Sequence, residues 1–141
     1  IMFIVNVEGA IYQNDKWLLI RRSEKEEHAG GLLSLVGGKV EKDGISSNIL
    51  EETLKREISE EVGVQVSNLR YVNSTLFVTD TGLTVVDIVF LCEHESGIPY
   101  AKCLGEVSEV YWVSTQEILD NPNLPVYLKA NIKLAYKLLH S

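Results

Sequence analysis

The sequence predicts an α/β fold in which helices cover the faces of a mixed β-sheet. Segments typical of strands and of helices are interleaved along the 141 residues, but they lack the strict strand–helix alternation of a doubly wound parallel sheet. Some neighbouring strand-like segments are joined by short turns, which favours antiparallel pairing. The length suits one domain over residues 1–141, and no internal repeat or interdomain linker interrupts it.

The strands are expected where β-branched and apolar residues gather between turn-forming residues. Asn14-Asp15 separates the first two strands, and Asp80-Thr81-Gly82 separates the two longest ones. The expected strands cover residues 3–12, 16–22, 32–36, 69–79, 83–92 and 106–113, and the third runs into a turn at Gly37-Gly38. Helices are expected over residues 49–62, from a cap at Ser114 to residue 119, and over 124–139.

The helix over residues 49–62 has the strongest boundary residues. Asn48 is a candidate N-cap, and Glu51 lies three residues on, where a capping-box partner belongs. Gly63 follows the last apolar residue, at the position where a left-handed residue commonly ends a helix. The segment 43–47 before it contains Asp-Gly and Ser-Ser, so it is expected to be a loop.

Composition and charge exclude several classes of protein. The net charge of −7 would repel a nucleic acid polymer, and no apolar run reaches the roughly 18 residues that span a membrane. Cys92 and Cys103 lack the spacing of a zinc site. Free thiols in a cytoplasmic protein are favoured over a disulfide.

Acidic residues on the same helix point to a metal site. At about 100° per residue, one apolar stripe forms along the helix: Leu50, Leu54, Ile58 and Val62. Glu61 falls between the positions of this stripe, Glu57 lies at its edge, and Glu60 lies outside it. Like charges at i and i+4 repel, and an ionised carboxylate beside a core costs several kcal/mol unless it is compensated. A hard cation such as Mg²⁺ would compensate it.

Simpler interpretations remain open for several of these residues. The glutamates away from the stripe suit a solvated helix face. Arg56 either forms an i to i+4 ion pair with Glu52 or Glu60, or orients the carboxylates. The run Gly37-Gly38-Lys39 is either an ordinary loop or a close backbone approach to a ligand, with a carbonyl for a metal and Lys39 for phosphate.

These residues resemble the Nudix hydrolase family. Its motif reads G-x5-E-x7-R-E-U-x-E-E-x-G-U, where U is a bulky aliphatic residue, and its second half is matched throughout by Arg56-Glu57-Ile58-Ser59-Glu60-Glu61-Val62-Gly63-Val64. The first half begins at Gly38 and departs from the pattern, because Asn48 stands where the family has Glu and the preceding gap is nine residues instead of five. The resemblance covers nearly the whole chain.

The resemblance implies an α/β/α sandwich around a mixed sheet and a magnesium-dependent hydrolase. The enzyme would cleave a phosphoanhydride bond in a nucleoside diphosphate derivative: a nucleoside triphosphate, an oxidised dNTP, ADP-ribose or a sugar nucleotide. Glu57, Glu60 and Glu61 would hold Mg²⁺, with Mn²⁺ as a possible substitute, and the Gly37 carbonyl would lie nearby. A homodimer is common in such proteins, but the sequence shows no interface pattern.

Roles in catalysis and substrate binding are predicted for residues on and around the helix. The general base is either a helix glutamate or a later one, Glu106 or Glu109, and the odd spacing of the later two means that only one is expected to face the site. The candidate catalytic residues are Glu57, Glu60, Arg56 and Glu106, and the candidate substrate-binding residues are Arg22, Lys39 and His28. Surface strand acids, a solvated strand end and a plain loop histidine are the alternatives for Glu106, Arg22 and His28.

Two other functions remain possible on this sequence. The altered first half of the motif is compatible with a catalytically inactive Nudix-fold module that binds nucleotides. An acidic helix is also compatible with a purely structural interaction protein. Nucleotide binding without turnover would favour the first, and failure to bind Mg²⁺ or Mn²⁺ would favour the second.

Overall fold

The computed structural model describes residues 2–26, 30–41 and 47–141. In these ranges the chain forms β1 (Phe3–Gln13), β2 (Lys16–Arg22), β3 (Leu33–Ser34), β4 (Val36–Lys39), α1 (Ile49–Val62), β5 (Gln65–Val78), β6 (Thr84–Ser96), β7 (Val107–Ser114), α2 (Thr115–Asp120) and α3 (Val126–Leu139). None of the described helices is long and apolar enough to cross a membrane.

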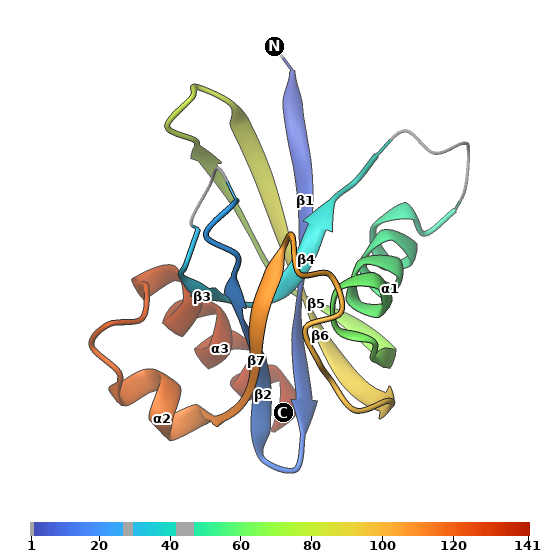
Figure 1. Ribbon diagram of the computed structural model, residues 1–141. Coiled ribbons are helices and arrows are strands. Elements are labelled where there is room, and N and C mark those ends of the chain that lie inside the picture. The colour runs from blue at the N-terminus through green and yellow to red at the C-terminus, as the bar shows by residue number, and fades with distance from the viewer. Residues whose placement is uncertain (1, 27–29, 42–46) are drawn as a thin grey trace.

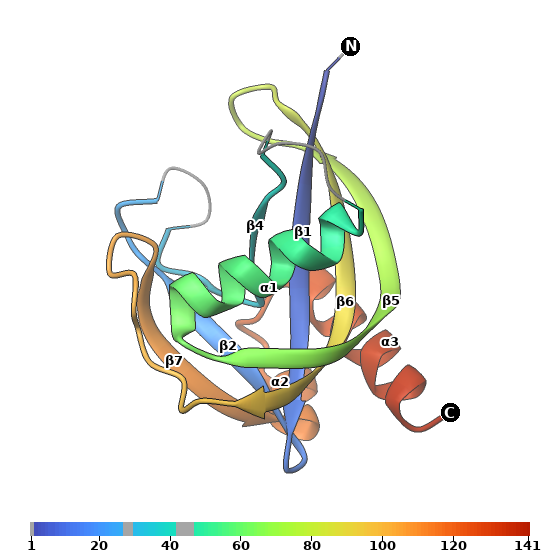
Figure 2. The ribbon, with the colours of Figure 1, turned by 90° about the vertical axis from the view of Figure 1, so that its right-hand side faces the viewer.

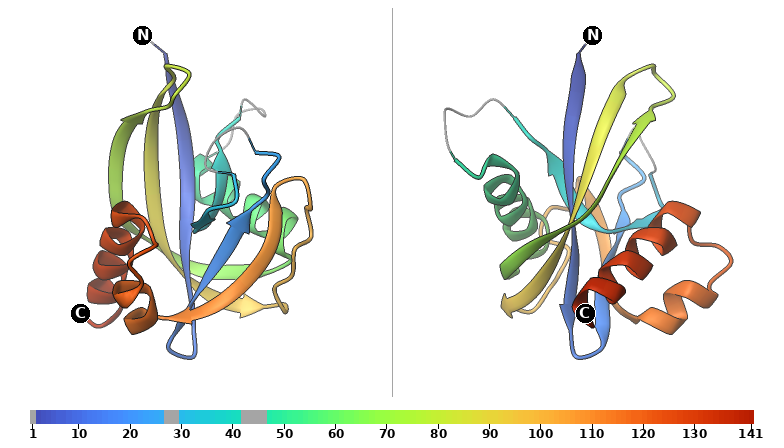
Figure 3. Two further views of the ribbon diagram at one scale, coloured as in Figure 1. Left: turned by 60° about the vertical axis from the view of Figure 1, so that its left-hand side comes forward. Right: turned by 180° about the vertical axis from the view of Figure 1, so that it is seen from behind.

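The strands form the mixed sheet that the sequence predicts. The order is β3-β2-β1-β6-β5, with β4 paired to β1 and β7 paired to β2. The long β1 and β6 run parallel, whereas β1 and β2, and likewise β5 and β6, pair antiparallel as hairpins. Helix α1 lies on one side of the sheet, and α2 and α3 lie on the other (Figures 1 and 3). The α/β/α sandwich is therefore confirmed.

A core fills the space on each side of the sheet. Side chains on β1 alternate between the two, because successive residues of a strand face opposite ways: Val7 and Ile11 join the core beneath α1, and Ala10 joins the core beneath α2 and α3. The apolar stripe of α1 closes the first core through Leu54, Ile58 and Val62, all with 0% exposure. This packing fixes which face of α1 is turned toward the sheet. Figure 2 shows the helix lying across the sheet.

The glycine pair lies within a strand, so the predicted turn is wrong. Gly37 and Gly38 belong to β4 and pair with Glu8 and Val7 of β1. A Cβ atom on Gly37 would collide with the Val7 carbonyl oxygen. The glycine therefore permits a close approach of two strands, a long-range contact that the local sequence does not reveal.

Helix α1 begins at the predicted residue for a different physical reason. Asn48 adopts a left-handed conformation with φ 56° and ψ 40°, and its side chain makes no capping hydrogen bond. The predicted side-chain cap and its capping box with Glu51 are therefore wrong. Asparagine tolerates this conformation better than most residues. Residues 43–46 of the expected loop lie outside the described residues. At the other end Gly63 is left-handed, with φ 69°, as predicted.

Replacing Asn48 by glutamate is expected to restore the family pattern without a large gain in rate. The left-handed backbone disfavours glutamate, so the free energy of unfolding should fall by about 1 kcal/mol. Asn48→Gly is the matched control, because glycine adopts this conformation freely. Thermal melting and Mg²⁺ titration of both variants test the expectation. Much tighter Mg²⁺ binding by Asn48→Glu would show that the absent carboxylate matters.

Candidate active site

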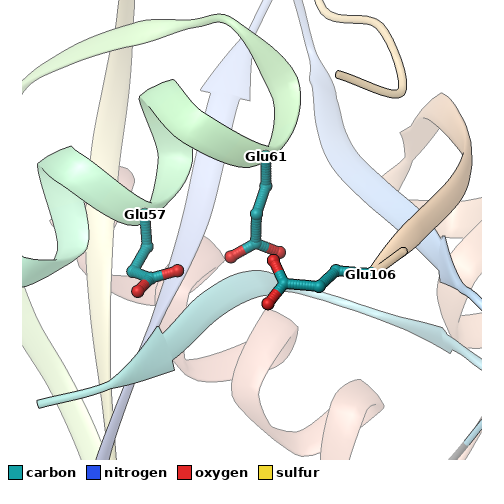
Figure 4. A group of neighbouring side chains, drawn as sticks. All are labelled: Glu57, Glu61 and Glu106. Carbon is teal, nitrogen blue, oxygen red and sulfur yellow. The ribbon is translucent and has the colours of Figure 1, made fainter. Parts of the chain in front are cut away.

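Three carboxylates converge beside the glycine pair. Glu57 and Glu61 extend from α1, and Glu106 comes from the segment just before β7 (Figure 4). One carboxylate oxygen from each residue lies within 4.8 Å of the other two. Glu61 is only 4% exposed, whereas Glu106 is on the surface. Oxygen ligands at this spacing suit a hard divalent cation.

The strand β4 leaves room for this group. A Cβ atom on Gly38 would lie 2.5 Å from the Glu57 carboxyl carbon, so any other residue there would displace the side chain. Glu57 and Glu61 are four residues apart and therefore stack on one side of α1. The buried residues Leu54, Ile58 and Val62 hold that side of the helix against the sheet. The packed helix thus fixes the positions of the two carboxylates, and Gly38 of β4 leaves space for the Glu57 side chain.

Without a cation, the site favours a bound proton. Burial is the main reason that the pKa of Glu61 is raised to about 10, and a hydrogen bond with Glu57 and the charge of Glu106 add to it. Burial also raises the pKa of Glu57, opposed by its hydrogen bond with Glu61 and the charge of Arg56. Glu61 is therefore the protonated partner at neutral pH. A cation would relieve the same repulsion, so the donor set fits a divalent metal.

The structure places Arg56 and Glu60 at the solvent edge of this group. Arg56 Nη1 lies 3.7 Å from a Glu57 oxygen and 3.6 Å from a Glu60 oxygen. The side chain of Glu60 is 58% exposed, and Glu60 is absent from the converging group of described residues. Arg56 thus forms the i to i+4 ion pair with Glu60 that was considered for it, and it also lies beside the Glu57 carboxylate.

Three of the other predicted residues, Glu109, Arg22 and Lys39, are described by the structure and lie outside the converging group. Glu109 turns away and forms an ion pair with Arg21, with 3.2 Å between Nε and Oε1. Arg22, at the end of β2, approaches Glu26 at 3.4 Å and lies close enough to Glu61 to lower its pKa. Lys39 is exposed at the end of β4. His28 lies outside the described residues.

A second pair of carboxyl groups, which the sequence did not reveal, lies on the other face of the sheet. Glu8 of β1 lies beside Asp87 of β6, and Asn6 Nδ2 donates to Asp87 Oδ1 at 2.7 Å. Burial first, then the hydrogen bond and charge of Asp87, raise the pKa of Glu8 well above its ordinary value, and Arg22 opposes this. The pairing depends on the parallel register of β1 and β6, a long-range contact that the local sequence does not determine.

Replacing Glu8 by glutamine is expected to stabilise the protein above neutral pH. A carboxyl whose pKa is raised in the folded state keeps a proton that the unfolded chain releases, so its contribution to stability falls as pH rises above about 4.5. At pH 8 the variant should gain at least about 1 kcal/mol over the wild type, with a smaller gain at pH 5. Urea unfolding at both pH values measures this. The same pH dependence in both proteins would contradict the expectation, and Glu52→Gln on the exposed face of α1 is the control.

The comparisons with known proteins establish the family. The NUDIX domain model matches residues 2–132, and the chain therefore belongs to this family. Nudix hydrolases generally use divalent metal ions. The converging carboxylates lie on the helix that carries the family motif and on the segment before β7.

Individual relatives are similar over most of this chain. A curated relative, the NAD-capped RNA hydrolase NudC of Photobacterium profundum, is 28% identical over 109 residues, which are 77% of this chain but only 37% of the relative. The MutT protein from Methanosarcina mazei Go1 has a TM-score of 0.79 and 27% identity, with 99% and 96% of the two chains covered. The NUDIX domain of Shewanella oneidensis NrtR, complexed with ADP ribose, has a TM-score of 0.73 and 21% identity, with 98% and 88% covered.

Proposed function

We propose that this chain is a magnesium-dependent hydrolase that cleaves a phosphoanhydride bond in a nucleoside diphosphate derivative. The observation that carries the proposal is the convergence of Glu57, Glu61 and Glu106, with Glu61 buried where burial and the neighbouring carboxylates oppose its ionisation. A structural role alone does not account for such an arrangement, because it costs stability. The hydrolase names of the similar proteins favour an enzyme over an inactive binding module.

The three carboxylates would form the principal ligand set for Mg²⁺. Glu60 and the Gly37 carbonyl are the further ligands expected from the family motif. The bound metal would supply neutralisation of the diphosphate charge and activation of a water for attack on phosphorus. The remaining steps belong to the chain's own residues.

Arginine and lysine side chains near the group would bind the phosphates. Arg22 lies at the end of β2 close to Glu61, and Lys39 ends the strand that carries the glycine pair. Their charges would hold the substrate's phosphates against the carboxylates and orient the bond to be broken. The proton released in the reaction needs an ionised acceptor. Glu57 suits this role because burial raises its pKa and makes it a stronger base, while the charge of Arg56 favours its ionised form.

A release screen with defined substrates tests the function. Phosphate and pyrophosphate are measured with and without Mg²⁺ over nucleoside triphosphates, oxidised dNTPs, ADP-ribose and sugar nucleotides. NAD belongs in the panel because the curated relative is an NAD-capped RNA hydrolase, and ADP-ribose because a similar domain is complexed with it. Turnover that requires Mg²⁺ and is lost in Glu57→Gln supports the proposal. Nucleotide binding without turnover would show an inactive module instead.

A further inference from the structure

Glu106 is carried by a different kind of backbone from the other two carboxylates. Glu57 and Glu61 project from a helix of 14 residues that is packed on the core. Glu106 ends a segment of irregular backbone, residues 97–106, that connects β6 to β7 and is called the strap below. The side chain of Glu106 is exposed, so packing does not hold it. Its position therefore depends on what fixes the strap.

Backbone hydrogen bonds attach the strap to the last turn of α1. The Tyr100 amide donates to the Val62 carbonyl at 3.1 Å, and the Lys102 amide donates to the Glu61 carbonyl at 3.0 Å. The Cys103 amide reaches the same Glu61 oxygen at 3.4 Å. Carbonyls at the C-terminal end of a helix have no partners within the helix. The strap satisfies them, and it does so at the residue that supplies the most buried carboxylate.

Two glycines permit this contact. Gly97 has φ 94°, and a Cβ atom there would lie 2.5 Å from the Gly63 carbonyl oxygen. Gly63, which ends α1, would in turn place a Cβ atom 2.6 Å from Cε1 of Tyr100. The start of the strap thus lies directly on the helix end, with no space for a side chain on either backbone.

The far end of the strap is fixed to the end of β2. The Glu106 amide donates to the Cys103 carbonyl at 2.9 Å, and the Glu106 carbonyl accepts from the Ser23 amide at 2.9 Å. Both backbone polar groups of Glu106 are therefore bonded. Ser23 follows Arg22, the candidate phosphate-binding residue. The strap consequently joins the metal-ligand helix to the strand end that carries Arg22.

His94 holds the beginning of the strap. Its Nε2 donates to the Gly97 carbonyl at 2.6 Å, and its Nδ1 accepts from the Gln13 side-chain amide at 2.9 Å. The ring meets Trp112 of β7 edge-on, with 5.9 Å between centroids. His94 thereby links β1, β7 and the strap without touching the carboxylates.

We propose that the strap is a positioning element that sets the place of Glu106 in the metal group, with Gly97 and His94 as positioning residues. This inference rests on the proposed function, because it assumes that Glu106 is a metal ligand. Residues that orient metal ligands from outside the ligand set commonly change metal affinity by about 10- to 100-fold when they are replaced. A ligand on irregular backbone should be especially sensitive to such changes.

The test compares alanine substitutions at two glycines with similar backbone conformations. Gly97→Ala adds a methyl group against the Gly63 carbonyl, whereas Gly82→Ala in the hairpin turn, with φ 86°, meets nothing within 4 Å. Both substitutions place alanine in a left-handed conformation, so both should lower the melting temperature by a similar amount. Any further decrease in Gly97→Ala reflects the collision with the Gly63 carbonyl. Mn²⁺ binding to the metal-free protein is measured by calorimetry. Gly97→Ala should bind at least about 10-fold more weakly, and Gly82→Ala should bind like the wild type.

A second pair of variants keeps the test valid if Gly97→Ala does not fold. His94→Phe retains the ring beside Trp112 but loses the hydrogen bond to the Gly97 carbonyl. His94→Gln keeps an N–H donor. The first should weaken Mn²⁺ binding several-fold, and the second should restore part of the loss. Equal affinity of His94→Phe and the wild type would overturn the inference.

A double-mutant cycle with Glu106→Gln separates this inference from the proposed function. If the strap acts through Glu106, the strap substitution should cost little further affinity once Glu106 is glutamine. Losses that simply add would mean that the strap acts elsewhere, and the inference would fail. If the wild type itself binds no Mn²⁺, or if Glu106→Gln binds as tightly as the wild type, the assigned ligand set is wrong instead.

Discussion

Replacing Glu61 by glutamine is expected to lower the rate of hydrolysis by at least about 100-fold, the scale on which single stabilisers of a transition state act. Glutamine keeps the shape and hydrogen-bonding capacity of Glu61 but removes the charge that would hold the metal. Glu61 is 4% exposed and is the most buried of the three carboxylates. The substitution therefore removes a central ligand without leaving a cavity.

The same substitution should leave the metal-free protein equally stable or more stable. In the metal-free protein, burial and the neighbouring carboxylates oppose ionisation of Glu61, and a neutral amide escapes that cost. The increase in melting temperature on adding Mg²⁺ should shrink, because a ligand that binds only the folded state stabilises it by mass action. Glu52→Gln, on the exposed face of the same helix, should change neither quantity. Normal turnover together with a normal Mg²⁺ shift in Glu61→Gln would refute the assignment of this helix.

Local sequence patterns predicted the elements whose causes are local. The bounds of α1 follow from its apolar period and from Gly63, and the structure gives the same residues, Ile49–Val62. The capping box of α2 is likewise present, with Ser114 accepting from the Glu117 amide at 3.1 Å. Both depend on residues within one or two helical turns. The local sequence is therefore sufficient to place Glu57 and Glu61 on the same side of the helix.

Contacts between distant segments were beyond the sequence pattern. The local sequence Gly37-Gly38 predicts a turn, whereas the structure pairs both residues with β1. The reason for glycine lies in this pairing, because the Val7 carbonyl leaves no space for a side chain at Gly37 and the Glu57 carboxylate leaves none at Gly38. The alternation of a strand indicated that Glu106 and Glu109 face differently but not which one approaches the helix. The strap decides this through main-chain bonds to α1, which depend on backbone position and leave no residue pattern.

Binding of Mg²⁺ is expected to strengthen steeply as pH rises. Burial and the neighbouring carboxylates raise the pKa of Glu61 to about 10, so the metal-free site holds a proton throughout the neutral range. A metal requires the ionised carboxylate, and its binding must release that proton. While one proton is displaced, the apparent affinity rises about 10-fold per pH unit, or about 100-fold between pH 6 and pH 8.

Calorimetry in buffers of different ionisation enthalpy measures both the affinity and the number of protons released. The wild type should release close to one proton per Mg²⁺ at pH 7. Glu61→Gln has no proton to release at that position, so it should release far less, and its Mg²⁺ affinity should depend less on pH.

The pH dependence of stability has the matching sign. A pKa raised by folding stabilises the metal-free protein below about pH 4.5 and is a growing cost as pH rises toward 10. Raising the pH thus weakens the metal-free fold while it strengthens metal binding, so the melting shift caused by Mg²⁺ should widen from pH 6 to pH 8. A shift and a proton release that do not change with pH would mean that Glu61 is already ionised without metal, and that the buried carboxylate is stabilised by something other than a cation.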